Sequence, residues 1–286
     1  MKIGIIGAEN SHTAAIAKLI NIDKQIRGCS VDYLWGETPE FAEQAAEAGQ
    51  IPNIVRKSTD MLGKIDALVV DHRHPKFHLK AAWPYVEAGI PTFIDKPFCY
   101  RSEEGKAFLD MAKKKKTPVT SFSILPFWDG FIRFKKKIPA LGKIVTGFSW
   151  GPCDLKSPWG GVFFYGIHQV DILLHAFGYD VKSVMVAKDG PNATGQLFYP
   201  HGLVVTMAFI QKDAPGFGMA AVGMTGDHHA PIVCGKNPYL RGARLFVEMF
   251  RTGKMPMTRE QMLRPVQVLE ALERSIKSGQ VETVER

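Results

Sequence analysis

The first part of the chain alternates short apolar runs with segments whose apolar residues recur at helical spacing. Short apolar runs bounded by turn residues are typical of buried strands, and the longer periodic segments are typical of amphipathic helices. The pattern predicts strands at 2–7, 31–35, 66–70, 91–95 and 118–124, with helices between them at 12–21, 38–49, 75–89 and 102–116. Strands that alternate with helices in this way form a parallel sheet covered on both faces, so we predict a doubly wound α/β domain.

After residue 122 the rhythm changes, because several strand-like runs follow one another without helices between them. These runs lie at 142–150, 181–188, 193–200, 202–210 and 218–226, and helices are expected at 131–137, 166–177, 240–253 and 259–279. Such runs favour a mostly antiparallel, open sheet. We therefore predict two domains, a doubly wound domain at 1–122 and an α+β domain at 123–286, with a cleft between them.

Composition and charge exclude several classes of protein. With 45% hydrophobic and 22% charged residues over 286 positions, the chain is typical of a globular protein. The net charge of +8 is concentrated in Lys113–Lys116 and Lys135–Lys137, which we expect at the ends of helices. No DNA-binding motif accompanies these runs, and no apolar stretch approaches the roughly 20 residues that span a membrane. We expect neither a nucleic-acid nor a membrane partner.

The cysteines and the N-terminal segment indicate a cellular compartment. The four cysteines lie far apart, without the paired spacing of a zinc or redox motif, so we expect reduced thiols. The chain enters a strand pattern directly after Lys2 and shows no signal-peptide pattern. We therefore expect a cytoplasmic protein.

The opening stretch KIGIIGAENSH, residues 2–12, has the strand and turn of a dinucleotide-binding fold with only part of its glycine motif. In G-x-G-x-x-G, the glycines allow a tight turn, close approach of the pyrophosphate and close helix packing. Gly7 supplies the first glycine, whereas Glu9 and His12 occupy the other two places. Asn10 or Ser11 is expected to cap the next helix. Taken alone, the stretch fits a nucleotide site and a plain strand-to-helix turn about equally well.

Two later segments resemble the glucose-fructose oxidoreductase, inositol dehydrogenase and rhizopine catabolism family (Gfo/Idh/MocA). HLKAAWPYVEAGIPTFIDKPF, residues 78–98, is similar to the family's helix, strand and Glu-Lys-Pro signature, with Asp95 in place of the glutamate. GIHQVDILLHAFG, residues 166–178, resembles its substrate-facing helix, and the segments 246–256 and 269–284 resemble its closing segments. The resemblance implies a Rossmann-like N-terminal sheet, NAD or NADP as cofactor, and a homodimer or homotetramer formed through the C-terminal sheet.

The helix at 166–177 carries candidate substrate chemistry. His168, Asp171 and His175 fall within about 60° on one helix face, separate from an apolar stripe. Lysine, arginine and glutamate are absent between Lys156 and Asp180, which favours a cleft wall over a solvated face. By resemblance, His175 is the acid or base, Asp171 its partner and Lys96 the cation that polarises the reacting hydroxyl. We assign substrate contacts to His168, Trp159 and Tyr165.

The cofactor is expected at the carboxyl ends of the parallel strands. There the acidic residue after the second strand should accept hydrogen bonds from the adenosine ribose, although Glu37 stands about one place late. In the histidine-rich stretch DHRHPKFH, His72, Arg73 and His74 either bind a phosphate or fill part of the cleft, and helix capping with solvent exposure explains them nearly as well. His228 and His229 are expected in a loop and receive no role. The cofactor residues that we assign are Gly7, Ala8, Glu9, Asn10, Ser11, His12, Glu37, His72, Asp95 and Lys96.

A metal site on the helix is the competing interpretation, because His168, Asp171 and His175 are all possible ligands. The absence of a glutamate base and the fit to the family motif favour the substrate-facing role, so we predict no metal. The sequence thus implies an NAD(P)-dependent oxidoreductase that transfers hydride between nicotinamide and a hydroxyl or keto group of a sugar, polyol or related compound. The alternative, favoured by Glu9 and Asp95, is a cofactor-deficient relative that acts as a sugar-binding or regulatory module.

Overall fold

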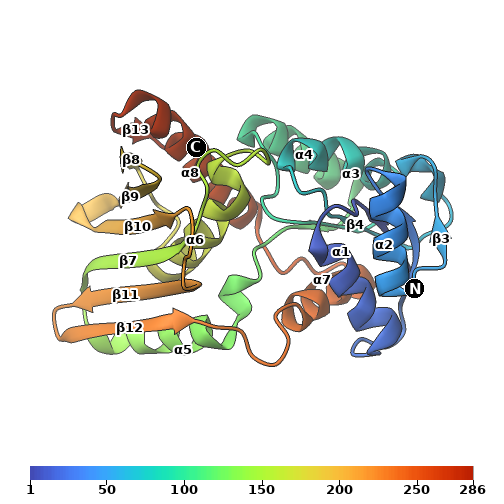
Figure 1. Cartoon of the computed structure of the whole chain (residues 1–286), viewed down its shortest axis with the longest axis horizontal. Coiled ribbons are helices and arrows are strands. Elements are labelled where there is room, and N and C mark those ends of the chain that lie inside the picture. Colours follow the sequence, from blue (N-terminus) through green and yellow to red (C-terminus); the bar gives the residue numbers. More distant parts are fainter. Residues whose placement is uncertain (286) are drawn as a thin grey trace. The chain divides into compact units, whose positions relative to one another are not determined.

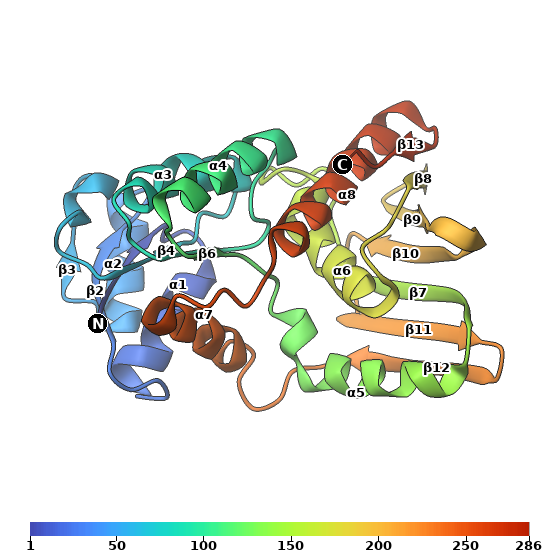
Figure 2. The same ribbon diagram turned by 180° about the vertical axis from the view of Figure 1, so that it is seen from behind.

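The computed structural model describes residues 1–285 and contains two compact units (Figures 1 and 2). Unit 1 consists of Met1–Phe122 and Tyr239–Met262, and unit 2 consists of Ser123–Pro238 and the segment that begins at Leu263. The domain boundary expected after residue 122 is also the first boundary between the units. Residues 239–262, which the sequence placed in the second domain, pack with unit 1.

Unit 1 is built on a six-stranded parallel sheet with the order β3-β2-β1-β4-β5-β6. Its strands are β1 (Lys2–Ile6), β2 (Ser30–Trp35), β3 (Asn53–Ile54), β4 (Ala67–Val70), β5 (Thr92–Ile94) and β6 (Val119–Thr120). Its helices are α1 (Ser11–Ala17), α2 (Pro39–Gly49), α3 (His78–Glu87), α4 (Ser102–Lys115) and α7 (Leu240–Thr252). This order confirms the predicted Rossmann-like sheet, while the strand expected at 118–124 is only two residues long.

The helices of unit 1 pack in pairs that follow the strand order. Figure 1 shows α1 beside α2 and α3 beside α4, in agreement with the contacts between these helices. Since strand order reverses between β1 and β4, right-handed crossovers place the two pairs on opposite faces of the sheet. The point of reversal is where ligands bind in folds of this kind, just beyond the carboxyl ends of the strands.

Local sequence explains where the helices of unit 1 begin and end. Thr38 accepts a hydrogen bond from the amide of Phe41 and Pro39 follows it, which is a favourable helix start. The lysine run at 113–115 forms the last turn of α4, where positive charge stabilises the negative end of the helix dipole. The lysine runs are therefore helix ends, as their position in the sequence suggested.

Unit 2 is built on a seven-stranded mixed sheet with the order β12-β11-β7-β10-β9-β8-β13. All its neighbouring strands are antiparallel except β7 and β10, which are parallel. The strands are β7 (Ile144–Pro152), β8 (Ser183–Asp189), β9 (Asn192–Phe198), β10 (Val204–Ile210), β11 (Phe217–Gly223), β12 (Gly226–Ile232) and β13 (Glu282–Thr283). The helices are α5 (Asp129–Lys137), α6 (Val162–Phe177) and α8 (Arg259–Ser278), whose first turn lies in unit 1.

The mostly antiparallel sheet of unit 2 confirms the fold class expected from the sequence. One local expectation is wrong, because His228 and His229 lie in β12 and not in a loop. The strand forms because Gly223 and Gly226 bracket a tight turn that pairs β12 with β11 along its whole length. Among residues 1–285, no helix combines the length and the apolar character needed to cross a membrane.

Candidate active site

The expected cofactor residues gather at the carboxyl ends of the strands of unit 1. Backbone bonds fix these ends, since the amide of Asp71 donates to the carbonyl of Ile6 at 2.7 Å and the amide of Asp95 donates to that of Val70 at 2.8 Å. Gly7 has a φ of +111°, and a Cβ there would lie 2.6 Å from the carbonyl carbon of Asp71. Only glycine fits this turn, so the first position of the glycine motif is structurally intact.

The carboxylate of Glu37 binds the opening turn directly. Its Oε2 accepts hydrogen bonds from the amides of Ala8 at 2.7 Å and Glu9 at 3.0 Å, and Oε1 lies 2.8 Å from Nδ1 of His72. Burial alone would raise the pKa of Glu37, but these bonds outweigh it and lower the pKa to about 2. Glu37 is therefore a fixed anion at neutral pH.

The side chains that replace the second and third glycines point to partners of opposite charge. The carboxylate of Glu9 lies 3.8 Å from the guanidinium of Arg73. His12 lies on α1, and its Nδ1 is 3.1 Å from Oδ2 of Asp95. The glycine motif is thus replaced by an ion pair and a histidine–carboxylate contact, neither of which the sequence pattern predicted.

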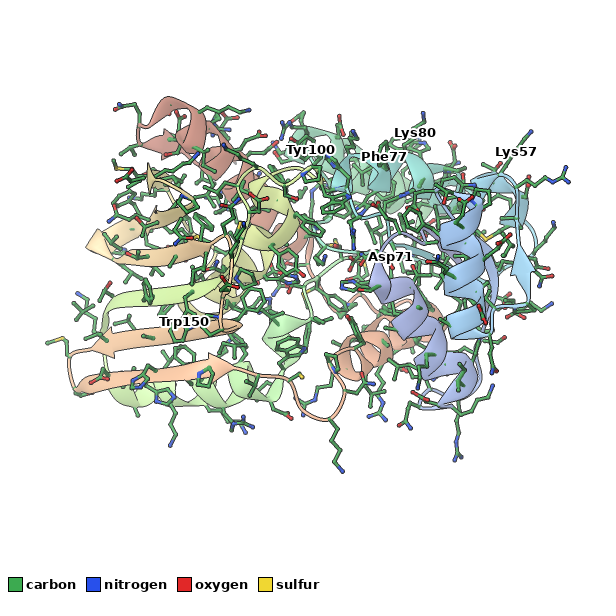
Figure 3. The ribbon with its side chains drawn as sticks, in the orientation of Figure 1. Lys57, Asp71, Phe77, Lys80, Tyr100 and Trp150 are labelled. Atoms are coloured by element: carbon green, nitrogen blue, oxygen red, sulfur yellow. The ribbon has the colours of Figure 1, made fainter. Side chains whose placement is uncertain are left out.

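Asp71 and Asp95 are two buried carboxylates bridged by one amide. Nδ2 of Asn10 donates to Oδ1 of Asp71 at 2.9 Å and to Oδ2 of Asp95 at 3.2 Å, while Thr13 donates to Oδ2 of Asp71 at 2.6 Å. Figure 3 places Asp71 beside the amino end of α1. Asn10 also caps α1, since its Oδ1 accepts a hydrogen bond from the amide of His12.

The pKa values of the two carboxyl groups are shifted in opposite directions. Burial and the negative charge of Asp95 hold the pKa of Asp71 well above its usual range. Burial acts in the same direction on Asp95, but the positive charges of His12 and Lys96 outweigh it and keep the pKa of Asp95 below its usual range. Of the two carboxylates, Asp71 therefore holds a proton more readily than Asp95.

Lys96 follows Asp95 at the end of β5 and is buried. Its Nζ lies 3.5 Å from Oδ2 of Asp95, and only 8% of its side chain is exposed. A buried ammonium beside an ionised carboxylate is held in one place, unlike a surface lysine. The cation expected at this strand end is thus present at the same edge as Gly7 and Glu37.

In unit 2, α6 presents His168 and Asp171 to one serine. Oγ of Ser123 lies 2.8 Å from Nδ1 of His168, and the amide of Ser123 donates to Oδ2 of Asp171 at 2.9 Å. Both α6 side chains are buried, so this polar stripe does not face solvent. Burial raises the pKa of Asp171 to about 7, although the Ser123 amide opposes the shift. The structure therefore holds a carboxyl group that titrates near neutrality.

An aromatic cluster joins the expected substrate residues Trp159, Tyr165 and His168. Trp159 packs on Phe164 with ring centroids 4.9 Å apart, Phe164 contacts Tyr165 at the same distance, and the rings of Tyr165 and His168 lie 5.6 Å apart. Tyr165 is exposed, whereas His168 is buried. The cluster combines an apolar surface with polar tips, as binding sites for small molecules often do.

His175 lies in a different environment on the same helix. It faces a shallow pocket of about 300 Å³ formed with α5 and the preceding turn, lined by Pro126, Phe127, Phe131, Ile132, Lys135 and Lys136. Burial first, and then the charge of Lys135, lower the pKa of His175 to about 4. The structure therefore groups Asp171 with His168 through Ser123, and it places His175 against α5.

Sequence reasoning missed several residues of these sites. Asp71, Thr13 and Ser123 received no role, although each makes a hydrogen bond of 2.9 Å or less within a group of candidate residues. His78 also went unassigned, and its two ring nitrogens lie 2.8 Å from the carbonyls of His72 and Pro97. For Asp71 and Ser123 a signal existed, since each follows a parallel strand at its carboxyl end.

Comparisons with known proteins support the family resemblance. Residues 1–122 match the model of the Gfo/Idh/MocA family, described as an oxidoreductase family with an NAD-binding Rossmann fold. No curated protein matches the sequence. The match confirms the resemblance, the Rossmann fold and the NAD-binding oxidoreductase class that the sequence implied.

Solved structures share the whole architecture at low sequence identity. The chain is similar to myo-inositol dehydrogenase from Lactobacillus casei in complex with NAD(H) and myo-inositol, with 16% identity, a TM-score of 0.85 and coverage of 100% of this chain and 97% of that one. The chain is also similar to apo scyllo-inositol dehydrogenase from the same organism, with 15% identity, a TM-score of 0.86 and coverage of 99% of this chain and 98% of that one. Its similarity to myo-inositol 2-dehydrogenase from Lactobacillus plantarum has 16% identity, a TM-score of 0.84 and coverage of 100% of this chain and 99% of that one. At this identity the likeness establishes the fold alone.

Proposed function

We propose that the chain is an NAD-dependent dehydrogenase of a cyclic polyol or sugar, from the premise that residues 1–122 match the model of an NAD-binding oxidoreductase family. The observation that carries the proposal is the gathering of Gly7, Glu37 and Lys96 at one edge of a Rossmann sheet. The substrate class follows the names of the similar structures, several of which are inositol dehydrogenases. Bound nicotinamide would supply the hydride acceptor or donor.

The opening turn fits the adenosine half of the cofactor. Gly7 permits the tight turn, and the ionised carboxylate of Glu37 is a strong acceptor for ribose hydroxyl groups. The same negative charge would repel the 2′-phosphate of NADP, and we therefore propose NAD as the cofactor. The side chains of Glu9 and His12, which stand where the pyrophosphate approaches, are held by Arg73 and Asp95.

The residues for proton transfer follow from the contacts of α6. We propose that Lys96 donates a hydrogen bond to the reacting oxygen, where its charge stabilises developing alkoxide. Asp171 and His168 share Ser123, and Asp171 has a pKa of about 7, close to the pH at which a proton acceptor is most effective. We therefore propose His168 as the imidazole beside the reacting group. This differs from the family resemblance, which implies His175 for that role.

Calorimetric titration with NAD and NADP tests the cofactor assignment. We expect NAD to bind the wild-type protein more tightly than NADP. Glu37→Gln should weaken NAD binding and reduce the difference in affinity between NAD and NADP, because it removes the charge but keeps the shape of the side chain. Glu43→Gln, on the exposed side of α2, is the matched control and should change neither affinity. Equal affinity for both cofactors in the wild-type protein would contradict the assignment.

A binding or regulatory module without cofactor is the second candidate, and one observation favours it. The amides of Ala8 and Glu9 already donate to Glu37, and glutamate and histidine replace two glycines. The same calorimetry separates the candidates, since a module of this kind would bind inositols or sugars while neither NAD nor NADP produces heat. Reduction of NAD by any polyol would exclude it.

Assembly and location remain proposals that rest on resemblance and composition. We propose a homodimer or homotetramer formed through the sheet of unit 2, where Val145, Phe148, Val222 and Met224 are exposed apolar side chains on β7, on β11 and in the turn that follows β11. Light scattering after size-exclusion chromatography would measure the mass, and a monomer at micromolar concentration would contradict the proposal. We propose a cytoplasmic location, as the scattered cysteines suggest.

A further inference from the structure

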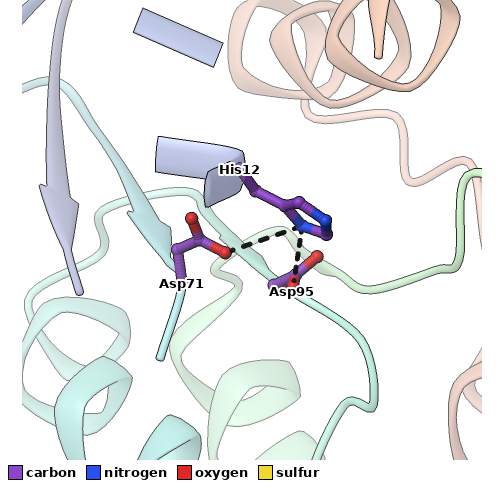
Figure 4. A group of neighbouring side chains, drawn as sticks. All are labelled: His12, Asp71 and Asp95. Carbon is purple, nitrogen blue, oxygen red and sulfur yellow. Dashed lines mark hydrogen bonds and ion pairs between the residues drawn. The ribbon is translucent and has the colours of Figure 1, made fainter. Parts of the chain in front are cut away.

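Three possible metal ligands from three separate strand ends converge in unit 1. His12 follows β1, Asp71 follows β4 and Asp95 follows β5, and one donor atom from each lies within 4.8 Å of the others. Figure 4 shows the imidazole of His12 facing both carboxylates. From this arrangement we infer that His12, Asp71 and Asp95 form a binding site for one divalent transition-metal ion, such as Mn²⁺ or Zn²⁺.

The distances are close to those that one ion requires. A metal about 2.0–2.2 Å from each ligand atom holds neighbouring ligand atoms about 3.0–3.4 Å apart, in tetrahedral or octahedral geometry. Nδ1 of His12 lies 3.1 Å from Oδ2 of Asp95 and 3.9 Å from Oδ1 of Asp71. The first distance lies within this range, whereas the second exceeds it, so binding of one ion would draw Nδ1 of His12 and Oδ1 of Asp71 closer together.

The two carboxylate ligands are buried and are oriented by a second layer of hydrogen bonds. Asp71 is fully buried, and 6% of Asp95 is exposed. Two carboxylates in such surroundings are costly unless cations or protons neutralise them. Thr13 binds one oxygen of Asp71, and Asn10 bridges Asp71 and Asp95, as partners of metal ligands commonly do.

The donor set indicates the class of ion. One imidazole nitrogen and two carboxylates suit Mn²⁺ or Zn²⁺ better than Mg²⁺, which prefers oxygen ligands in strict octahedral geometry. Lys96 Nζ lies 3.5 Å from Oδ2 of Asp95 and competes with the ion for this oxygen. The imidazole of His12 is the feature that distinguishes the site from an ordinary lysine–aspartate pair, and it stands where the glycine motif has its third glycine.

The site shares His12 and Asp95 with the proposed cofactor site, and it is tested without substrate or cofactor so that its failure is distinguishable from failure of the proposed function. The full-length protein is stripped with a chelator, dialysed, and titrated with MnCl₂ and, separately, with ZnCl₂. Calorimetry gives the affinity and stoichiometry, and loss of the free-ion Mn²⁺ EPR signal gives a second measure. We expect one ion per chain, and we expect MgCl₂ to bind more weakly.

Two variants and two controls identify the ligands. His12→Gln and Asp95→Asn keep the size of each side chain, and each should weaken binding by about 10- to 100-fold. His229→Gln and Asp189→Asn change exposed residues of β12 and β8 and should leave the affinity unchanged. Circular dichroism establishes that each variant is folded.

Either of two results would overturn the inference. One is that the stripped wild-type protein binds neither Mn²⁺ nor Zn²⁺, in which case the three side chains form a hydrogen-bonded network only. The other is that both folded variants at His12 and Asp95 bind as tightly as the wild-type protein, which would place the ion elsewhere.

Discussion

The strand ends of unit 1 and helix α6 of unit 2 concentrate polar groups by different means. In unit 1, His12, Asp71 and Asp95 are 59 and 24 residues apart in sequence and are brought together by the parallel sheet. In unit 2, His168, Asp171 and His175 lie on one helix at fixed spacing, yet their partners differ, since Ser123 contacts His168 and Asp171 whereas His175 lines a pocket with residues of α5. A shared face predicts which side chains point in one general direction, whereas packing of neighbouring elements decides which of them meet.

Lys96→Met should have the largest effect, because the reacting oxygen would lose its charged hydrogen-bond donor. Loss of one such donor costs about 3–4 kcal/mol of transition-state stabilisation, which corresponds to a fall in kcat of about 10²- to 10³-fold. The measurement is reduction of NAD in the presence of inositols. Lys80→Met, at an exposed position on α3, is the control and should retain full activity. Full activity of Lys96→Met would remove this residue from the mechanism.

The histidines of α6 provide the sharpest test of the comparison. His168→Gln should reduce kcat by about 10²-fold or more, since it removes the imidazole that contacts Ser123. His175→Gln, two turns further on, should cost less than about 10-fold because its side chain lies against α5. Steady-state kinetics of both variants shows which of the two histidines acts as the acid or base. The reverse order of effects would restore His175 as the acid or base.

Asp171→Asn should change how stability depends on pH. The pKa of Asp171 is raised by burial to about 7, so the folded state favours the protonated carboxyl. Its contribution to stability is full below the unfolded-state pKa near 4 and is lost as the pH rises through 7, by up to about 4 kcal/mol. Asparagine cannot ionise and still accepts the Ser123 amide, so the variant should be more stable than the wild-type protein at pH 8.

Urea unfolding at pH 5 and pH 8 measures this difference. Asp189→Asn, at the exposed end of β8, controls for the general effect of removing a carboxylate. Parallel pH profiles for Asp171→Asn and the wild-type protein would show that Asp171 is already ionised at low pH.

The smallest effect is expected at the pocket of His175. Burial is the main reason that its pKa is lowered to about 4, and the charge of Lys135 adds to the shift. Lys135→Met should therefore raise the pKa of His175 only part of the way to its ordinary value. Titration of the histidine ring signals by NMR measures the change, with Lys137→Met as the control. A full return of the pKa would indicate that charge, not burial, is the cause.

Local sequence patterns predicted the sheet of each unit and part of the candidate site. Alternating apolar runs and helical periodicity are local signals, and they sufficed to predict the doubly wound parallel sheet of unit 1 and the mostly antiparallel sheet of unit 2. The residue Lys96 could be placed because it directly follows a strand. Glu37 could be assigned to the cofactor site, but its contact with Ala8 and Glu9 was not predicted, since its exact position depends on how β2 ends.

Contacts between distant segments could not be predicted from the sequence. The bridge that Asn10 makes between Asp71 and Asp95 joins three segments, and its formation depends on the register of β1, β4 and β5. Likewise, the environment of His175 depends on α5, whose position cannot be deduced from spacing along α6. Helical spacing therefore predicts a shared face, but it does not show that Ser123 contacts His168 and Asp171 while α5 packs near His175.

The most direct test of the proposed function is an absorbance assay of nicotinamide reduction at pH 8, with NAD and a panel of inositols and sugars. The wild-type protein should reduce NAD with at least one cyclic polyol, and Lys96→Met should not. If no compound in the panel reduces NAD and calorimetry detects no NAD binding by the folded protein, the dehydrogenase proposal is contradicted and the binding module is the better description.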